Sequence, residues 1–155
     1  MTIKVLEKTQ GCMPQTFDVG DWYDLRLAEN VELKSRFDSC IASLGVCIEV
    51  PKGYECIIAP RSSTFKKYGV LLSNSIGVID NLYKGDNDVW KAPLTATRKV
   101  SIPKGTRVAQ FRVQLSQKAT WWQKIKWLLA GNIKLVKVAS LNNPDRKGFG
   151  STDSK

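Results

Sequence analysis

The chain has no histidine among its 155 residues. A histidine base and the usual zinc sites are therefore excluded, and any base catalysis has to come from a carboxylate. No stretch approaches the roughly 20 apolar residues of a membrane span, and the charged, alternating segment 1–8 does not have the pattern of a signal peptide. There is no Cys-x-x-Cys pair either, so we expect a cytoplasmic protein with reduced core cysteines at positions 12, 40, 47 and 56.

Positive charge, in contrast, is in excess. Lys and Arg number 24 against 14 Asp and Glu, for a formal net charge of +10. A basic surface attracts nucleoside triphosphates, DNA and acidic proteins, and it can also be no more than a solvated surface. The length suits one domain with a proper core.

The hydrophobic pattern is mostly that of short strands. Turn signals at 51–53, 84–88 and 103–105 separate many of them. Numerous short strands with regular turns are typical of an all-β sandwich or barrel. The expected strands are 3–7, 31–33, 43–50, 54–59, 70–72, 76–79, 89–92, 99–102, 107–114 and 133–138.

One segment has helical spacing instead. Thr120 and Gln123 fit a capping box, and Gly131 is a natural stop, so we predict a helix over 121–130. Its apolar stripe is expected to pack on the chain's own sheet, through Trp121, Ile125 and Leu128. The alternative is an exposed patch that binds a partner, formed by Trp122 or Trp127 with Lys124 and Lys126.

The segment 60–90 carries the chemistry. Arg61 and the two serines after it follow a strand-like run and can bind phosphate. Some twenty residues on, an apolar strand ends in Asp80, and Tyr83 follows a turn. A carboxylate that can activate water and a ring that can cover a sugar would then lie on one hairpin, which suggests nucleotide chemistry. Taken alone, Asp80 would be an ordinary turn aspartate.

Five segments, in order, resemble the five motifs of the trimeric dUTPase family, which hydrolyses dUTP to dUMP and pyrophosphate. They are 21–25, 60–63, 74–85, 104–111 and 145–152, and together they span nearly the whole chain. The variants at 60–65 and 85–90 are similar to those of the branch found in Gram-positive bacteria and their phages. Trp22, Leu82 and Thr106 depart from the family pattern.

The resemblance implies a jelly-roll-like subunit that forms a homotrimer, with a C-terminal arm that reaches a neighbouring subunit. We therefore expect one β domain over 1–141, with a helical insertion at about 120–131, and a flexible arm over 142–155 that carries the fifth motif. The substrate would be dUTP, with Mg²⁺ bound mainly by the triphosphate.

The resemblance also implies residue roles. Asp80 would be the catalytic base, and Asp24 would hold a metal-bound water. Uracil and deoxyribose would be bound by Asn74, Gly77, Val78, Ile79, Tyr83 and Phe149. The phosphates would be bound by Arg61, Ser62, Ser63, Gln110, Arg146, Gly150, Ser151 and Thr152.

Two alternatives stay open. The dCTP deaminases share the fold and the Arg-Ser-Ser segment, but they need a catalytic Glu shortly after the hairpin, and residues 84–92 contain none. A regulatory protein of the same fold, which binds a repressor, is the other alternative and could coexist with the enzyme. No membrane or nucleic-acid partner is expected.

Overall fold

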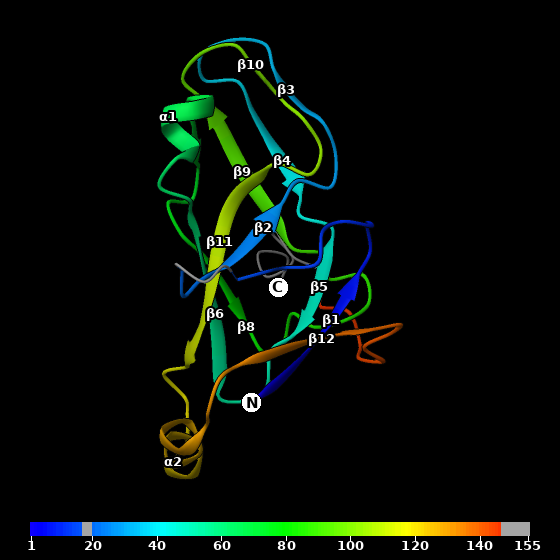
Figure 1. Ribbon diagram of the computed structural model, residues 1–155, viewed down its shortest axis with the longest axis vertical. Helices are drawn as coiled ribbons and strands as arrows, with labels where there is room; N and C mark the ends of the chain where they lie inside the picture. Colours follow the sequence, from blue (N-terminus) through cyan, green and yellow to red (C-terminus); the bar gives the residue numbers. More distant parts are fainter. Residues whose placement is uncertain (17–19, 147–155) are drawn as a thin grey trace, which may run out of the picture.

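The protein is described here from a computed structural model, in which residues 1–16 and 20–146 are described. Strands dominate it, and the two helices of the described part are α1 (Thr64–Tyr68) and α2 (Trp121–Leu129) (Figure 1). The strands are β1 (Thr2–Glu7), β2 (Tyr23–Arg26), β3 (Val31–Leu33), β4 (Ser39–Ser43), β5 (Val46–Glu49), β6 (Tyr54–Pro60), β7 (Val70–Leu72), β8 (Gly77–Asp80), β9 (Lys91–Ala96), β10 (Val100–Ile102), β11 (Arg107–Leu115) and β12 (Lys134–Val138).

The strands form small sheets. The sheet that carries the motifs has the order β2-β11-β6-β8 and is antiparallel throughout. Two further sheets have the orders β12-β1-β5 and β4-β9-β7, and β10 pairs with β3. The predicted all-β architecture is confirmed.

The strand predictions differ from the structure at three places. Strand β4 was not predicted, apart from its last residue, Ser43. The run predicted over 43–50 is interrupted at Gly45, whose positive φ of 68° turns the chain between β4 and β5. Strand β2 was not predicted, because only four residues pair there and the partner strand β11 is distant in sequence.

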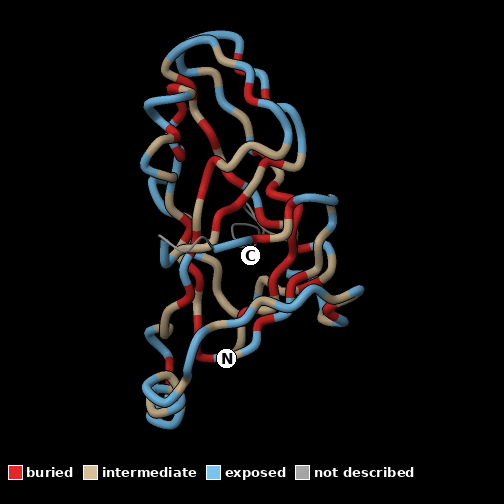
Figure 2. Tube along the Cα trace, viewed as in Figure 1, coloured by how far each residue is buried: buried red, intermediate tan, exposed pale blue. Residues whose placement is uncertain are grey.

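The core lies between the sheets, and buried positions alternate with exposed ones along strands such as β6 and β9 (Figure 2). At its centre the rings of Trp90 and Phe111 meet edge to face at 5.0 Å, and Tyr23 stacks on Phe111 at 5.2 Å. Burying a side chain of this size stabilises the fold by about 1.5–3 kcal/mol. Cys47 is among the buried free cysteines, and burial raises the pKa of its thiol to about 11, which keeps it protonated.

Helix α2 lies at one end of the molecule, far from α1 (Figure 1). The predicted capping box is present: Thr120 Oγ1 accepts a hydrogen bond from Gln123 N, and Gln123 Oε1 accepts one from Thr120 N. The helix ends at Leu129, one residue before the predicted end, where Ala130 turns to an extended conformation; Gly131 follows as predicted, but without a positive φ. Among the described residues, no helix has the length and apolar character needed to cross a membrane.

The face of α2 that packs on the body differs from the prediction. Trp127 meets Tyr54 at 5.6 Å between ring centroids, and Gln123 Nε2 donates to Lys52 O at 2.8 Å. Trp121 and Leu128, which were expected to pack on the sheet, are instead 70% and 81% exposed. The prediction was wrong because apolar side chains occur on two faces of the helix. Which face packs depends on where the helix lies against the sheet, and the local sequence does not determine this.

Candidate active site

Asp80 is the last residue of β8, which pairs with β6, so the predicted hairpin is not formed; beyond Asp80 the chain leaves the sheet in the turn that leads to Tyr83. One carboxylate oxygen accepts a hydrogen bond from Leu82 N at 2.8 Å, and the other accepts one from Arg146 Nη1 at 2.5 Å. Burial raises the pKa of Asp80, but the hydrogen bonds from Arg146 and Leu82 outweigh this effect, so the pKa lies below its ordinary value. The carboxylate is therefore ionised at neutral pH, as a proton acceptor must be.

Tyr83 lies at the other side of the same turn. Its hydroxyl donates to Val89 O at 3.0 Å, and its ring packs against the hydrophobic core. The ring is thereby fixed in place three residues from the carboxylate that precedes it. Burial raises the pKa of this phenol, which stays neutral.

The other described residues predicted to bind uracil precede Asp80 along the chain, in β8 and in the turn before it. Asn74 is exposed in the turn before β8, and Ser75 beside it has a positive φ of 61°. A Cβ on Gly77 would come within 3.3 Å of Ile58 Cβ and 3.7 Å of Asn74 Nδ2. The absence of a side chain at Gly77 therefore lets the turn lie close to β6, and Val78 and Ile79 continue the strand.

The predicted phosphate-binding residues gather where β6 ends beside β11. Asp24, on β2 and 6% exposed, accepts from Arg61 Nε at 2.6 Å and from Arg107 Nη1 at 3.0 Å. Gln110 Nε2 donates to Pro60 O at 3.3 Å. Ser62 is exposed, and Ser63 is the N-cap residue before α1. Asp24 therefore orients two guanidinium groups, a role that the sequence did not reveal, because Arg107 lies 83 residues away.

Arg146 is the one described phosphate-binding candidate that reaches the predicted base within the chain, whereas Arg61 does not come near Asp80. In the antiparallel pair of β8 and β6, Asp80 lies opposite Glu55 at the start of β6, and Arg61 follows the far end of that strand. At about 3.3 Å per residue, the two are roughly 20 Å apart. One chain thus presents two half-sites.

The predicted turn at 84–88 has a role that sequence analysis missed, because it holds residues 140–146 in place. In the turn 85–88, Asp86 accepts hydrogen bonds from Ser140 Oγ and Leu141 N at 2.5 and 2.7 Å. Asp88, which is 2% exposed, accepts from Arg146 N at 2.9 Å.

Asp145 completes this attachment, since it accepts from the backbone N and side-chain Nδ2 of Asn87 at 2.9 and 2.8 Å. Asp86, Asp88 and Asp145 stand in a half of the chain that has few other acidic residues, and this was the sequence feature that could have indicated the attachment. Residues 140–146, where the predicted arm would begin, are therefore fixed to the turn 85–88 of their own chain, with Arg146 at Asp80. Phe149, Gly150, Ser151 and Thr152 lie outside the described residues.

No group of three or more Cys, Asp or Glu side chains within the described ranges is placed to hold a metal ion. Both carboxylate oxygens of Asp24 already accept from arginines. Direct coordination of a cation by Asp24 does not fit this arrangement.

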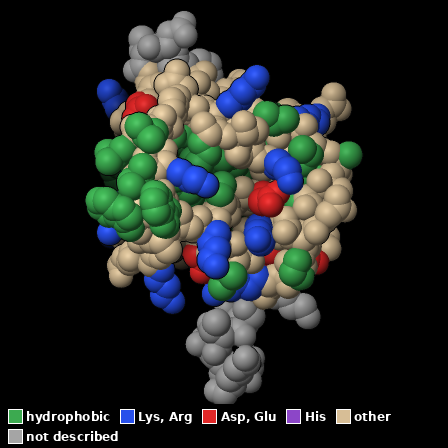
Figure 3. All heavy atoms as spheres, turned by 90° about the horizontal axis from the view of Figure 1, so that it is seen from below, with side chains coloured by type: hydrophobic (Ala, Val, Ile, Leu, Met, Phe, Trp, Pro, Cys, Tyr) green, Lys and Arg blue, Asp and Glu red, His purple; other side chains and the backbone are tan. Residues whose placement is uncertain are grey.

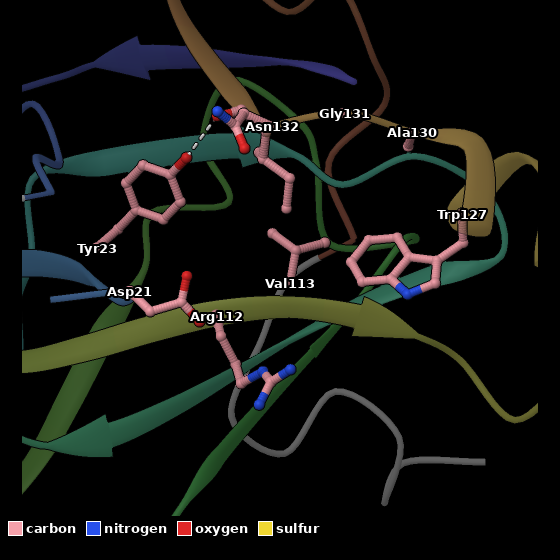
Figure 4. A pocket seen from close by; sticks show the side chains of 9 residues that line it. Asp21, Tyr23, Arg112, Val113, Trp127, Ala130, Gly131 and Asn132 are labelled. Carbon is pink, nitrogen blue, oxygen red and sulfur yellow. Dashed lines mark hydrogen bonds between the residues drawn. The ribbon is translucent and has the colours of Figure 1, made fainter.

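A hollow of about 330 Å³ lies elsewhere, between β2, β11 and the connection from α2 to β12 (Figure 4). Asp21, Tyr23 and Trp127 are on its wall, and Tyr23 Oη donates to Ile133 O at 2.8 Å. None of the described residues predicted to bind dUTP lines this hollow, so we do not assign it as the reaction site.

The all-β fold and the order of the motifs indicate a nucleotide hydrolase of the dUTPase class, and comparisons with known proteins show the family. Residues 17–125 match the family model for dUTPase. The SPbeta prophage-derived deoxyuridine 5'-triphosphate nucleotidohydrolase YosS of Bacillus subtilis is 43% identical over 153 residues, which cover 99% of this chain and 97% of that protein. The deoxyuridine 5'-triphosphate nucleotidohydrolase of Hydrogenobaculum is 34% identical over 134 residues, which cover 85% and 83%. The chain belongs to the dUTPase family.

Solved structures show the same fold. The dUTPase of Streptococcus mutans has a TM-score of 0.67 at 24% identity, with 77% of this chain and 99% of that chain covered. A dUTPase from phage phi11 of S. aureus, solved as a point mutant with a structural Mg(II) ion, also has a TM-score of 0.67, at 17% identity and 77% and 94% coverage. The expected jelly-roll fold and the likeness to proteins of Gram-positive bacteria and their phages are confirmed.

Proposed function

We propose that the chain hydrolyses dUTP to dUMP and pyrophosphate in a site shared between subunits of a homotrimer. Family membership supports the substrate. The observation that carries the mechanism is Asp80, an ionised carboxylate at the end of β8 whose pKa is held low by Arg146 and Leu82.

Asp80 acts as the general base. It accepts a proton from a water molecule, whose oxygen forms a bond to the α-phosphorus. The bond from the α-phosphorus to the bridging oxygen breaks, and pyrophosphate leaves. Because Arg146 occupies Asp80 Oδ2 in the described chain, this guanidinium has to release that oxygen or share it with the water.

The residues of β8 and the turns beside it select the substrate. Tyr83, held by Val89 and the core, packs on the deoxyribose and leaves no room for a 2′-hydroxyl. Asn74 and the backbone of Gly77, Val78 and Ile79 bind the edge of uracil. Paired polar groups of this kind discriminate between bases more strongly than an apolar wall does. Phe149 covers the base.

The triphosphate lies at the other half-site. Arg61, oriented by Asp24, binds phosphate oxygens with Ser62, Ser63 and Gln110, and Ser62 stabilises the charge that develops on the leaving side. Arg146, Gly150, Ser151 and Thr152 of the arm complete the phosphate contacts. Mg²⁺ would be held mainly by the triphosphate, and Asp24, whose oxygens keep acceptor sites beside the arginine contacts, could accept a hydrogen bond from one of its waters.

Assembly follows from the distance between the half-sites. A base roughly 20 Å from Arg61 of its own chain cannot act on a nucleotide whose phosphates that residue binds. A closed ring of three chains would place Asp80 of one subunit beside Arg61 of the next, with three equivalent sites.

Pyrophosphate release from a panel of deoxynucleoside triphosphates in the presence of Mg²⁺ tests the proposal. Release from dUTP, with little from dTTP, dCTP or UTP, is the expected result. Ammonia release from dCTP would indicate the deaminase alternative instead.

A further inference from the structure

Helix α2 presents an apolar face that the rest of the described chain does not cover. Trp121, Trp122, Leu128 and Leu129 are 70–81% exposed. Exposed apolar residues scattered singly over a protein surface are ordinary, but four large ones on nine helical residues form a patch.

This face is held in a fixed orientation. The opposite side of the helix is attached to the body by Trp127, which packs on Tyr54, and by Gln123, which bonds to Lys52 O. Tyr54 Oη also donates to Gln123 O at 3.4 Å. The capping box fixes the first turn. The four side chains are therefore presented outward by a built helix, and the exposure does not result from fraying.

The lysines of α2 lie on both sides of the apolar face. At about 100° per residue, the apolar side chains at 121, 122, 125, 128 and 129 fall within an arc of about 120°. Lys124 lies beyond one edge of this arc and Lys126 beyond the other, and both are exposed. Trp127 and Gln123 fall opposite its centre, in agreement with their contacts to the body.

The charges on the segment that contains α2 have one sign, and Asp21 is an acidic neighbour of the helix, in the hollow beside Trp127. No Asp or Glu occurs between Val89 and Pro144, a stretch that contains eleven Lys and Arg. Seen from the end of the molecule where α2 lies, a cluster of hydrophobic side chains has basic side chains near it (Figure 3). A surface that complements α2 has to accept apolar side chains, and the lysines beside them favour one that is negatively charged.

We propose that α2 binds an anionic lipid surface, with its apolar face in the boundary between headgroups and acyl chains. A helix with Trp and Leu on one face and Lys along the edges is the composition of interfacial helices. Indole rings suit this depth because they are apolar with one polar N–H, and lysine stems let the ammonium groups reach the headgroups. The expectation of no membrane partner was drawn from the lack of a spanning segment, which such a helix does not need.

The size of the patch favours this surface over a second protein. Two tryptophans of about 150–250 Å² each, with two leucines, expose on the order of 500 Å². A stable protein interface needs about 800 Å² from each partner. Binding to a lipid surface does not need a minimum buried area of this kind. In the proposed trimer, the three-fold axis would place the three copies of α2 on the same side of the assembly, so that all three could bind one surface.

Co-sedimentation with vesicles tests the proposal. Full-length protein is mixed with vesicles of phosphatidylcholine alone or with 3:7 phosphatidylglycerol to phosphatidylcholine, at low and high salt. The variant Trp121→Ser/Trp122→Ser/Leu128→Ser/Leu129→Ser removes the apolar face, and Lys118→Gln/Lys124→Gln/Lys126→Gln removes nearby charge. Phe37→Ser is the matched control, because Phe37 is 69% exposed between β3 and β4, away from α2.

The wild type and Phe37→Ser are expected to bind the anionic vesicles, and salt should weaken this binding. Each of the two helix variants should reduce partitioning by about tenfold or more, with pyrophosphate release unchanged. Absence of binding by the wild type, or equal binding by the serine variant, would overturn the proposal. Loss of the oligomer in the serine variant, measured by light scattering, would also overturn it, since α2 would then be an interface between copies.

Discussion

Arg146 Nη1 donates a hydrogen bond to Asp80 Oδ2 at 2.5 Å, and so joins the start of the C-terminal arm to the proposed base of the same chain. The two residues are 66 positions apart in sequence. The contact lowers the pKa of Asp80, and it places a residue of the predicted arm at the end of β8 rather than at the Arg61 half-site. It also shows that the arm begins its path on its own subunit, wherever the residues after 146 lead.

Asp80→Asn should lower kcat by about 10²–10⁴ while dUTP binding is largely retained, because the amide keeps the shape but cannot accept the proton. Steady-state kinetics and calorimetric titration with dUTP measure the two quantities. Asp38→Asn, a change of the same chemistry in the turn before β4, is the control and should have near wild-type turnover. If Asp80→Asn retained that turnover, Asp80 would not be the base.

Arg146→Gln should move the acid limb of the pH profile of kcat/KM to higher pH. The hydrogen bond and charge of Arg146 hold the pKa of Asp80 below its ordinary value, so the carboxylate stays ionised as pH falls. Without Arg146, burial raises the pKa of Asp80, and protonation inactivates the base sooner. Arg146→Lys keeps the charge and should shift the limb less. An unchanged limb in Arg146→Gln would show that this contact does not persist in the active assembly.

Asp80→Asn and Arg61→Ala chains should restore activity to each other when they are co-assembled. In a shared site, Asp80 of one chain acts with Arg61 of its neighbour, so about a quarter of the sites in a random equimolar trimer contain both intact residues. Activity is measured after refolding the inactive chains together and separately. Failure to recover activity in mixed trimers, verified by tagged pull-down, would mean that each chain completes its own site.

Gly85→Ala should loosen the attachment of the arm. A Cβ at this position would come within 2.6 Å of the Asp145 Cα atom, so backbone has to shift. We expect limited proteolysis to cleave faster within 140–146 and kcat/KM to fall, with the trimer kept. Gly131→Ala is the matched control, because no atom lies within 4 Å of its Cβ and its φ is not positive. Equal protease resistance of the two variants would count against the anchoring role.

Trp127→Ala should destabilise the protein by about 1–2 kcal/mol, since it removes a half-buried ring that packs on Tyr54. Trp122→Ala on the exposed face should change the free energy of unfolding by less than about 0.5 kcal/mol. Urea denaturation compares the two. The opposite order of stabilities would mean that the helix packs through its other face.

Much of the fold was predictable from local patterns. Alternating apolar residues and turn signals indicated an all-β subunit, and the Thr120–Gln123 capping box indicated where α2 begins. These features depend on neighbours within a few residues, where side-chain period and backbone preferences act directly. Motif order also identified the family before any contact was known.

The placement of Asp80 away from Arg61 could not be predicted, because it depends on the register between β6 and β8. The same holds for Asp24 between Arg61 and Arg107, for the attachment of 140–146 to the turn 85–88, and for the face by which α2 packs. Each of these joins segments that are distant along the chain. The sequence by itself determined which groups can donate, accept or be buried, whereas the tertiary structure decided which of them meet, because pairing between strands and packing against a core select one partner among many of similar chemistry.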